Sequence, residues 1–172
     1  SLEAFCLKFS STVNVTQLDD FDELIDVRSP SEFALDHLPD AINLPVLDDA
    51  QREQVGTLYK QTSSFEAKKI GAALVARNIA AHLETTLQDR PKNWQPLVYC
   101  WRGGNRSASL AHVLRQIGWN AQVLEGGYKA YRRHVIAELE RLPATVQLRV
   151  VCVPTGSGKS RLLQQLAHLG GQ

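Results

Sequence analysis

One short segment of the chain has the residue types of a nucleophilic site. It reads Cys100-Trp101-Arg102-Gly103-Gly104-Asn105-Arg106, it follows the apolar run Pro96–Tyr99, and a helical pattern opens after it at Ser107. A strand that turns sharply into a helix places the cysteine sulfur over backbone N–H groups, which favour the thiolate over the thiol. The two glycines let the backbone curl around the sulfur, and the two arginines add positive charge. The spacing therefore predicts an anion-binding loop with Cys100 as its nucleophile.

A thiolate held over several N–H donors supports two reactions. It can attack phosphorus and carry a phosphoryl group, or it can carry a sulfur or selenium atom as a persulfide-type adduct. Both reactions leave negative charge in the loop, and the same donors stabilise that charge. Cys6 and Cys152 have no comparable surroundings, and we interpret them as structural or incidental.

A second phosphate-binding pattern lies near the C-terminus. Residues 146–153 read as a buried strand, and the glycine-rich segment Thr155-Gly156-Ser157-Gly158-Lys159-Ser160 leads from it into an apolar helical start. In such a P-loop the backbone N–H groups cradle phosphate, Lys159 reaches the terminal phosphate, and Ser160 ligates magnesium when a nucleotide binds. The pattern departs at Val153, where it requires glycine, because a branched side chain hinders the approach of the backbone to phosphate.

The rest of the sequence alternates strands with helices. Strands are expected over residues 23–27, 41–44, 96–99 and 121–124, and helices from Pro30 to before Pro39, over 64–87, from Ser107 to a stop at Gly118, and after Gly127. This alternation predicts an α/β fold with a parallel sheet flanked by helices, in which ligands bind beyond the carboxyl ends of the strands. Cys100 lies at such an end.

Side-chain patterns mark the ends of these elements. The segment Ser29-Pro30-Ser31-Glu32 is a capping box with proline at the first helical position. Residues 48–60 are mixed and polar, and no element is predicted there. The last helix is predicted to turn the following side chains inward: Tyr128, Tyr131, Val135, Leu139 and Leu142.

Pro143 marks the predicted domain boundary, with one domain over residues 1–142 and the beginning of a P-loop domain over 143–172. One strand and one helix cannot bury their apolar faces alone, so the second domain is expected to be incomplete and the chain to be a fragment of a longer protein or a truncated copy. We find no metal-ligand spacing.

The composition is that of a globular protein, with 44% hydrophobic and 22% charged residues. No apolar run is long enough to span a membrane, no signal peptide is visible, and the odd number of cysteines, three, favours free thiols in a cytoplasmic setting. The net charge is only +1, but residues 1–100 carry −6 and residues 101–172 carry +7. The cationic half contains both anion-binding patterns, which suggests an anionic ligand such as RNA.

Three separated segments resemble the rhodanese family. They are Asp26–Phe33, then His37–Pro45, and then Trp119–Gly127, which ends Leu-Glu-Gly-Gly. The resemblance implies that Cys100 is a persulfide-carrying nucleophile and that Asp26 and Arg28 are structural, as a buried ion pair at a strand end would be. One feature departs from small rhodaneses, because five residues rather than four separate Cys100 from Arg106. Five is also the spacing in cysteine phosphatases, so the spacing keeps a phosphatase open.

The longer context resembles the family of tRNA 2-selenouridine synthases. The segments that carry this resemblance are Val55–Gln61, Phe65–Ala67, Gly71–Ile79, the cysteine loop, Gly126–Arg132 and the glycine-rich segment after it. The resemblance implies a transferase that replaces sulfur by selenium in 2-thiouridine at the tRNA wobble position. It implies selenophosphate as selenium donor, an S-geranylated intermediate made from geranyl diphosphate, and no tightly bound cofactor.

By this resemblance Cys100 would carry selenium or assist its delivery. Arg102, Arg106 and the loop N–H groups would hold selenophosphate or the selenolate charge, and Trp101, Gly103, Gly104, Asn105 and Ser107 complete the predicted loop. Two alternatives stay open: a cysteine phosphatase of the rhodanese fold, and a non-catalytic rhodanese module that binds an anion or RNA.

Overall fold

The fold is described from a computed structural model of the 172-residue chain, which covers residues 12–61, 63–142, 158, 160–161 and 164–165. The chain divides into two compact units, residues 1–137 and 138–172. The sheet and the cysteine loop both belong to the first unit.

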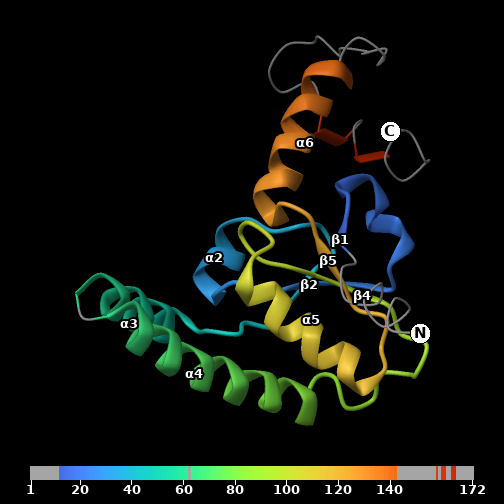
Figure 1. The fold of residues 1–172 in the computed structure, drawn as a ribbon. Helices are drawn as coiled ribbons and strands as arrows, with labels where there is room; N and C mark the ends of the chain where they lie inside the picture. The colour runs from blue at the N-terminus through green and yellow to red at the C-terminus, as the bar shows by residue number, and fades with distance from the viewer. Residues whose placement is uncertain (1–11, 62, 143–157, 159, 162–163, 166–172) are drawn as a thin grey trace. The chain divides into compact units, whose positions relative to one another are not determined.

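A five-stranded parallel sheet forms the centre of the described first unit (Figure 1). Its strands are β1 (Thr12–Val13), β2 (Glu23–Asp26), β3 (Ile42–Asn43), β4 (Pro96–Tyr99) and β5 (Gln122–Leu124), in the spatial order β1-β5-β4-β2-β3. The central strand β4 pairs with β2, with Ile25 opposite Val98, and with β5, with Val98 opposite Val123. All four residues of β4 are buried, as expected for a parallel strand covered on both faces.

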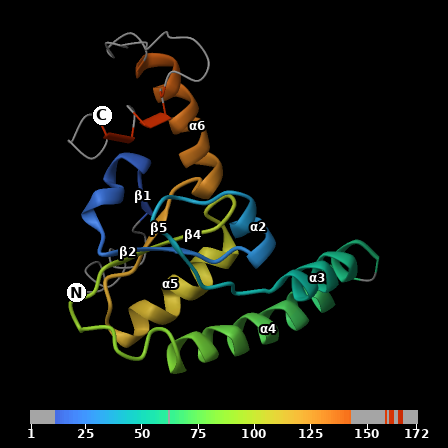
Figure 2. The same cartoon turned by 180° about the vertical axis from the view of Figure 1, so that it is seen from behind.

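The alternation of side chains along β4 divides the core into two clusters. Val98 and Cys100 pack on the face covered by α4 (Ser64–Glu84) and α5 (Asn105–Ile117). Leu97 and Tyr99 pack on the opposite face, against side chains from η1 (Val15–Asp20), α2 (Pro30–Leu35) and the start of α6 (Gly127–Arg141). Helices α3 (Asp49–Gln61) and α4 contact each other and form a hairpin that extends beyond the sheet (Figure 2).

Most sequence-predicted elements are confirmed, with shifted ends. Strand β4 matches its prediction, the Ser29–Glu32 capping box forms at the start of α2, and Gly118 ends α5 in the left-handed conformation with φ 113°. Helix α5 begins at Asn105, two residues before the predicted start at Ser107, and α4 ends at Glu84 rather than at residue 87.

Two sequence-based expectations need correction. Helix α3 occupies the segment where no element was predicted. None of its residues is fully buried, and its half-buried positions Gln51, Val55 and Leu58 form only a weak apolar face. Along α6 the inward orientation holds for the buried Tyr128 but not for Leu139 and Leu142, which are 61% and 43% exposed. None of the helices within the described ranges combines the length and the apolar character needed to cross a membrane.

Candidate active site

Cys100 lies at the carboxyl end of the central strand, directly before the turn into α5. Its Sγ lies 3.3 Å from the backbone nitrogen of Gly104, which donates to it, and 3.3 Å from Oγ of Ser107. The Ser107 hydroxyl also lies 3.0 Å from the carbonyl oxygen of Gly104. That hydroxyl can therefore donate to a thiolate, or to the carbonyl when Cys100 carries the proton. The predicted contact between the sulfur and the helix N-terminus is present.

These contacts decide the ionisation of the sulfur. Burial by itself would raise the pKa of Cys100, whose side chain is almost completely covered. The Ser107 hydroxyl and the backbone N–H groups of Ser107, Arg102 and Gly104 outweigh burial, so the pKa of Cys100 lies below the ordinary value of a thiol. A lowered pKa raises the thiolate fraction near neutral pH, and the thiolate is the nucleophilic form.

Glycines shape the loop at two points of close approach. Gly103 has φ 68°, and a Cβ there would lie 2.6 Å from the carbonyl oxygen of Leu124. Gly127 has φ 57°, and a Cβ there would collide with the carbonyl oxygen of Cys100 and lie 2.6 Å from the nitrogen of Gly103. Gly104, by contrast, has φ −99° and open space around its Cα, so it contributes its N–H rather than an unusual conformation.

The two loop arginines differ in their partners. The guanidinium of Arg106 donates to Glu32 of α2 at 2.8 Å, and Glu32 also accepts from Arg52 at 3.1 Å. Burial would raise the pKa of Glu32, but Arg106 and the other donors hold it below its usual range. Arg102 is exposed, and its backbone N–H helps to stabilise the sulfur. The positive charge of Arg106 is therefore partly neutralised by Glu32. This ion pair was not predicted from the sequence.

The predicted Asp26–Arg28 ion pair is present beside the loop. Both side chains are buried, and Arg28 Nη2 lies 2.6 Å from Asp26 Oδ2 while Arg28 Nε donates to both carboxylate oxygens. Arg28 Nη2 also donates to the carbonyl oxygen of Asp36 at 2.7 Å, and its guanidinium lies 4.1 Å from the centre of the Tyr128 ring. The pair therefore ties the end of β2 to the start of α6.

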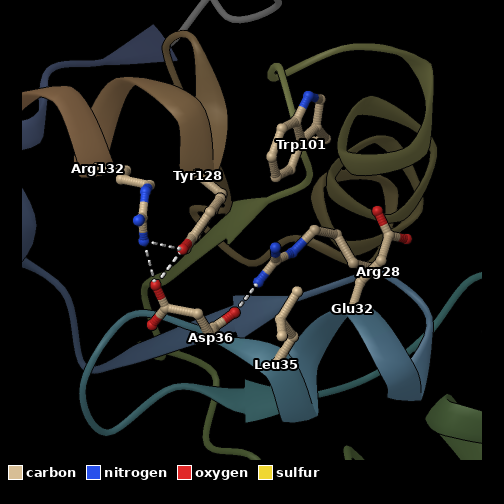
Figure 3. Close-up of a pocket in the computed structure, with 7 residues that line it drawn as sticks. All are labelled: Arg28, Glu32, Leu35, Asp36, Trp101, Tyr128 and Arg132. Atoms are coloured by element: carbon tan, nitrogen blue, oxygen red, sulfur yellow. Dashed lines mark hydrogen bonds and ion pairs between the residues drawn. The ribbon is translucent and has the colours of Figure 1, made fainter.

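A pocket of about 420 Å³ opens at this end of the sheet (Figure 3). Its lining residues are Arg28, Glu32, Leu35, Asp36, Trp101, Tyr128 and Arg132. Of these, only Trp101 was among the predicted site residues. The others come from α2, from the end of β2 and from α6, and no local sequence signal connects Asp36 with Tyr128 across 92 residues. Within the described residues no group of three or more His, Cys, Asp or Glu side chains is placed to hold a metal ion.

Most of the predicted P-loop lies outside the described residues, including Val153, Thr155, Gly156, Ser157 and Lys159. Gly158 has φ 83° and Ser160 is exposed in helical conformation. Phosphate binding by this segment stays a prediction.

The contacts around the sulfur predict how variants change its reactivity. Replacing Ser107 by alanine removes a hydroxyl that touches Sγ, so we expect the pKa of Cys100 to rise. Replacing Arg106 by alanine should raise it less, because that guanidinium contacts Glu32. The rate of alkylation by iodoacetamide against pH measures both shifts, and an unchanged midpoint for Ser107→Ala would contradict the proposed role of the hydroxyl.

A parallel sheet with a cysteine in the turn between its central strand and a helix fits a rhodanese-like protein. The family model for the rhodanese-like domain matches residues 13–134, and the chain belongs to this family. The resemblance read from the three sequence segments is confirmed.

Curated proteins similar to this chain include tRNA 2-selenouridine synthases. The chain is 39% identical over 146 residues to a tRNA 2-selenouridine synthase of Nitrosomonas europaea and 39% identical over 143 residues to one of Psychromonas ingrahamii. These alignments cover 84% and 83% of this chain but only 38% and 39% of the relatives. The chain therefore spans about two fifths of the length of these curated relatives.

A solved structure supports the same fold. The N-terminal domain of a Clostridium difficile 630 protein described as ATP/GTP binding superimposes with a TM-score of 0.63 at 35% identity. The match covers 73% of this chain and 99% of that domain.

Proposed function

We propose that this chain is the chalcogen-handling part of a tRNA 2-selenouridine synthase. The observation that carries the proposal is the environment of Cys100, where Sγ lies 3.3 Å from both the Gly104 nitrogen and Ser107 Oγ and its pKa is lowered. The relatives that align with this chain are named for that activity. The chain aligns with only about two fifths of the length of these relatives, so the activity of a complete synthase is part of the proposal.

The thiolate can accept a chalcogen by a balanced displacement. With thiosulfate, the Cys100 thiolate attacks the outer sulfur, a new S–S bond forms, the old S–S bond breaks, and sulfite leaves with the electron pair. The resulting persulfide is an anion with its charge on the outer sulfur, and we propose that N–H groups of the loop stabilise that charge.

The finer chemistry follows from the family resemblance. We propose selenophosphate as the selenium donor, held by the N–H groups of the loop together with Arg102 and Arg106. We propose tRNA bearing wobble 2-thiouridine as the acceptor, S-geranyl-2-thiouridine as the intermediate, and geranyl diphosphate as its source. The P-loop segment would bind a phosphate-containing substrate or nucleotide. We propose a cytoplasmic location, where the reducing environment keeps Cys100 as a free thiol.

Intact-mass measurement after incubation with thiosulfate tests the proposal. We expect one adduct on the wild-type chain and complete loss of it in Cys100→Ser, while Cys152→Ser keeps it. Equal labelling of Cys100→Ser and wild type would refute the assignment.

The phosphatase alternative has a specific weakness in this site. Hydrolysis of a phosphate ester needs a general acid to protonate the leaving group. Hydrogen bonding from Tyr128 lowers the pKa of Asp36, and the pKa of Glu32 is also lowered, so both pocket carboxylates are ionised near neutral pH. We therefore expect no hydrolysis of an alkyl phosphate, whose leaving group must be protonated, and turnover abolished by Cys100→Ser would instead support the phosphatase. The non-catalytic alternative predicts salt-sensitive RNA binding with no adduct on Cys100.

A further inference from the structure

The pocket beside the cysteine loop presents apolar surface to solvent at a position where polar side chains would be expected. Leu35 is 88% exposed and Trp101 is 40% exposed, and both line the same pocket. In Figure 3 the two side chains lie on either side of the Arg28 side chain, with the indole on the loop and the leucine on α2. Exposed apolar side chains that converge on one pocket indicate a ligand with an apolar surface of its own.

The indole of Trp101 is held as a rigid platform. It stacks on Tyr128, with ring centroids 5.5 Å apart and an interplanar angle of 29°. The Tyr128 phenol donates to Asp36, which also accepts from Arg132 at 2.9 Å. The stacking contact with Tyr128 places the indole beside the pocket, where a further ring can stack on it.

The charges around the pocket favour a nucleotide over a simple anion. Arg132 is 59% exposed, and only its Nη1 is engaged among the described residues, so its other N–H groups can reach a phosphate of an RNA backbone. Arg28 is buried and committed to Asp26 and to the carbonyl of Asp36, so it is not available to a free anion. An inorganic anion would also make no apolar contact with the exposed side chains of Trp101 and Leu35.

The platform is next to the nucleophile in the chain. Trp101 follows Cys100 directly, and consecutive Cα atoms lie about 3.8 Å apart. The far end of the loop reaches the same pocket, because Arg106 is paired with the pocket residue Glu32. The pocket therefore contains one residue of the cysteine loop, Trp101, and a residue paired with another, Glu32.

We propose that this pocket receives the target 2-thiouracil base, unstacked from its RNA strand. The base stacks on Trp101 and contacts Leu35, and Arg132 contacts an adjacent phosphate. This inference rests on the proposed function and adds the residues that select the base. Single-stranded RNA is commonly bound in this way, with unstacked bases on aromatic side chains and basic residues along the backbone.

A double-mutant cycle between protein and RNA tests the platform. The full chain is titrated with a short single-stranded anticodon-loop oligonucleotide that carries 2-thiouridine, and with the same oligonucleotide abasic at that position. For Trp101→Ala we expect a roughly tenfold or greater loss of affinity for the first and almost none for the second. Trp101→Phe keeps an aromatic ring and should retain most of the affinity.

Two further variants separate stacking from general attraction. Phe65→Ala removes an exposed aromatic ring outside the pocket and should leave both affinities unchanged. Arg132→Gln should weaken both oligonucleotides alike and reduce the slope of log affinity against log salt by about one.

Three results would overturn the proposal: equal losses for the two oligonucleotides in Trp101→Ala, no wild-type preference for the base over the abasic site, or no binding of either. Failure of the proposed function shows separately, as absence of a Cys100 adduct in a chain whose base-dependent binding persists.

Discussion

Gly127→Ala is expected to lower the free energy of unfolding by about 4 kcal/mol, a large part of the total for a domain of this size. The methyl group would collide with the carbonyl oxygen of Cys100 and lie 2.6 Å from the nitrogen of Gly103, so backbone atoms on both sides would have to move. The residue also has φ 57°, which alanine adopts only with strain. Because the displaced atoms belong to the cysteine loop, the Cys100 pKa should rise in whatever fraction stays folded.

Urea unfolding of the full chain measures the stability change, and two other glycines provide matched controls. Gly104→Ala has negative φ and open space, so its effect should be small. Gly118→Ala has φ 113° and open space, so it should cost about 1–2 kcal/mol from backbone strain alone. If Gly127→Ala costs no more than Gly118→Ala, the close approach of α6 to the loop does not constrain the fold.

The fold could be predicted where the sequence pattern reflects burial on a single element. Strand β4 is apolar throughout because it is covered on both faces, and α5 shows a stripe at helical spacing because one face packs on the sheet. Helix α3 was missed because its half-buried face includes only two apolar residues, Val55 and Leu58, and none of its side chains is fully buried. The ends of α5 and α4 shifted by two or three residues, since the end of a helix depends on the contacts of its last turn.

The sequence predicted the contacts of the site between residues close in the chain, but not those between distant residues. The contact between Sγ and the Gly104 N–H follows from a strand that turns into a helix, and it is present. The pairing of Arg106 with Glu32 joins residues 74 positions apart and leaves no mark in either segment. The role of Gly127 was missed for the same reason, since the Gly126-Gly127 pair reads as a turn and not as the neighbour of the Cys100 carbonyl.

The long-range contacts explain why the cysteine loop and the pocket form one unit. The carbonyl of Cys100 accepts from the nitrogen of Tyr128 at 2.9 Å, so the start of α6 is fixed to the loop backbone. The Tyr128 side chain then supports Trp101 and contacts Arg28. The buried ion pair of Arg28 thus bears on both stability and the shape of the pocket.

Asp26→Asn is expected to lower the free energy of unfolding by about 3–5 kcal/mol. Arg28 is buried with its charge balanced by Asp26, and the amide would leave that charge uncompensated in the core. The amide NH₂ would also face guanidinium N–H groups, which replaces hydrogen bonds by contacts between donors. Thermal or urea unfolding measures the loss.

Two further variants show whether the loss of stability comes from the unpaired buried charge. One removes an exposed carboxylate, and the other removes both buried charges. Glu66→Gln breaks the exposed Lys69–Glu66 pair and should change stability by no more than about 0.5 kcal/mol. Asp26→Leu combined with Arg28→Met removes both buried charges and should be less destabilised than Asp26→Asn. If Asp26→Asn is as stable as the wild type, the buried guanidinium needs no counter-charge. The double variant should also lose part of its affinity for RNA, because Tyr128 loses its contact with Arg28.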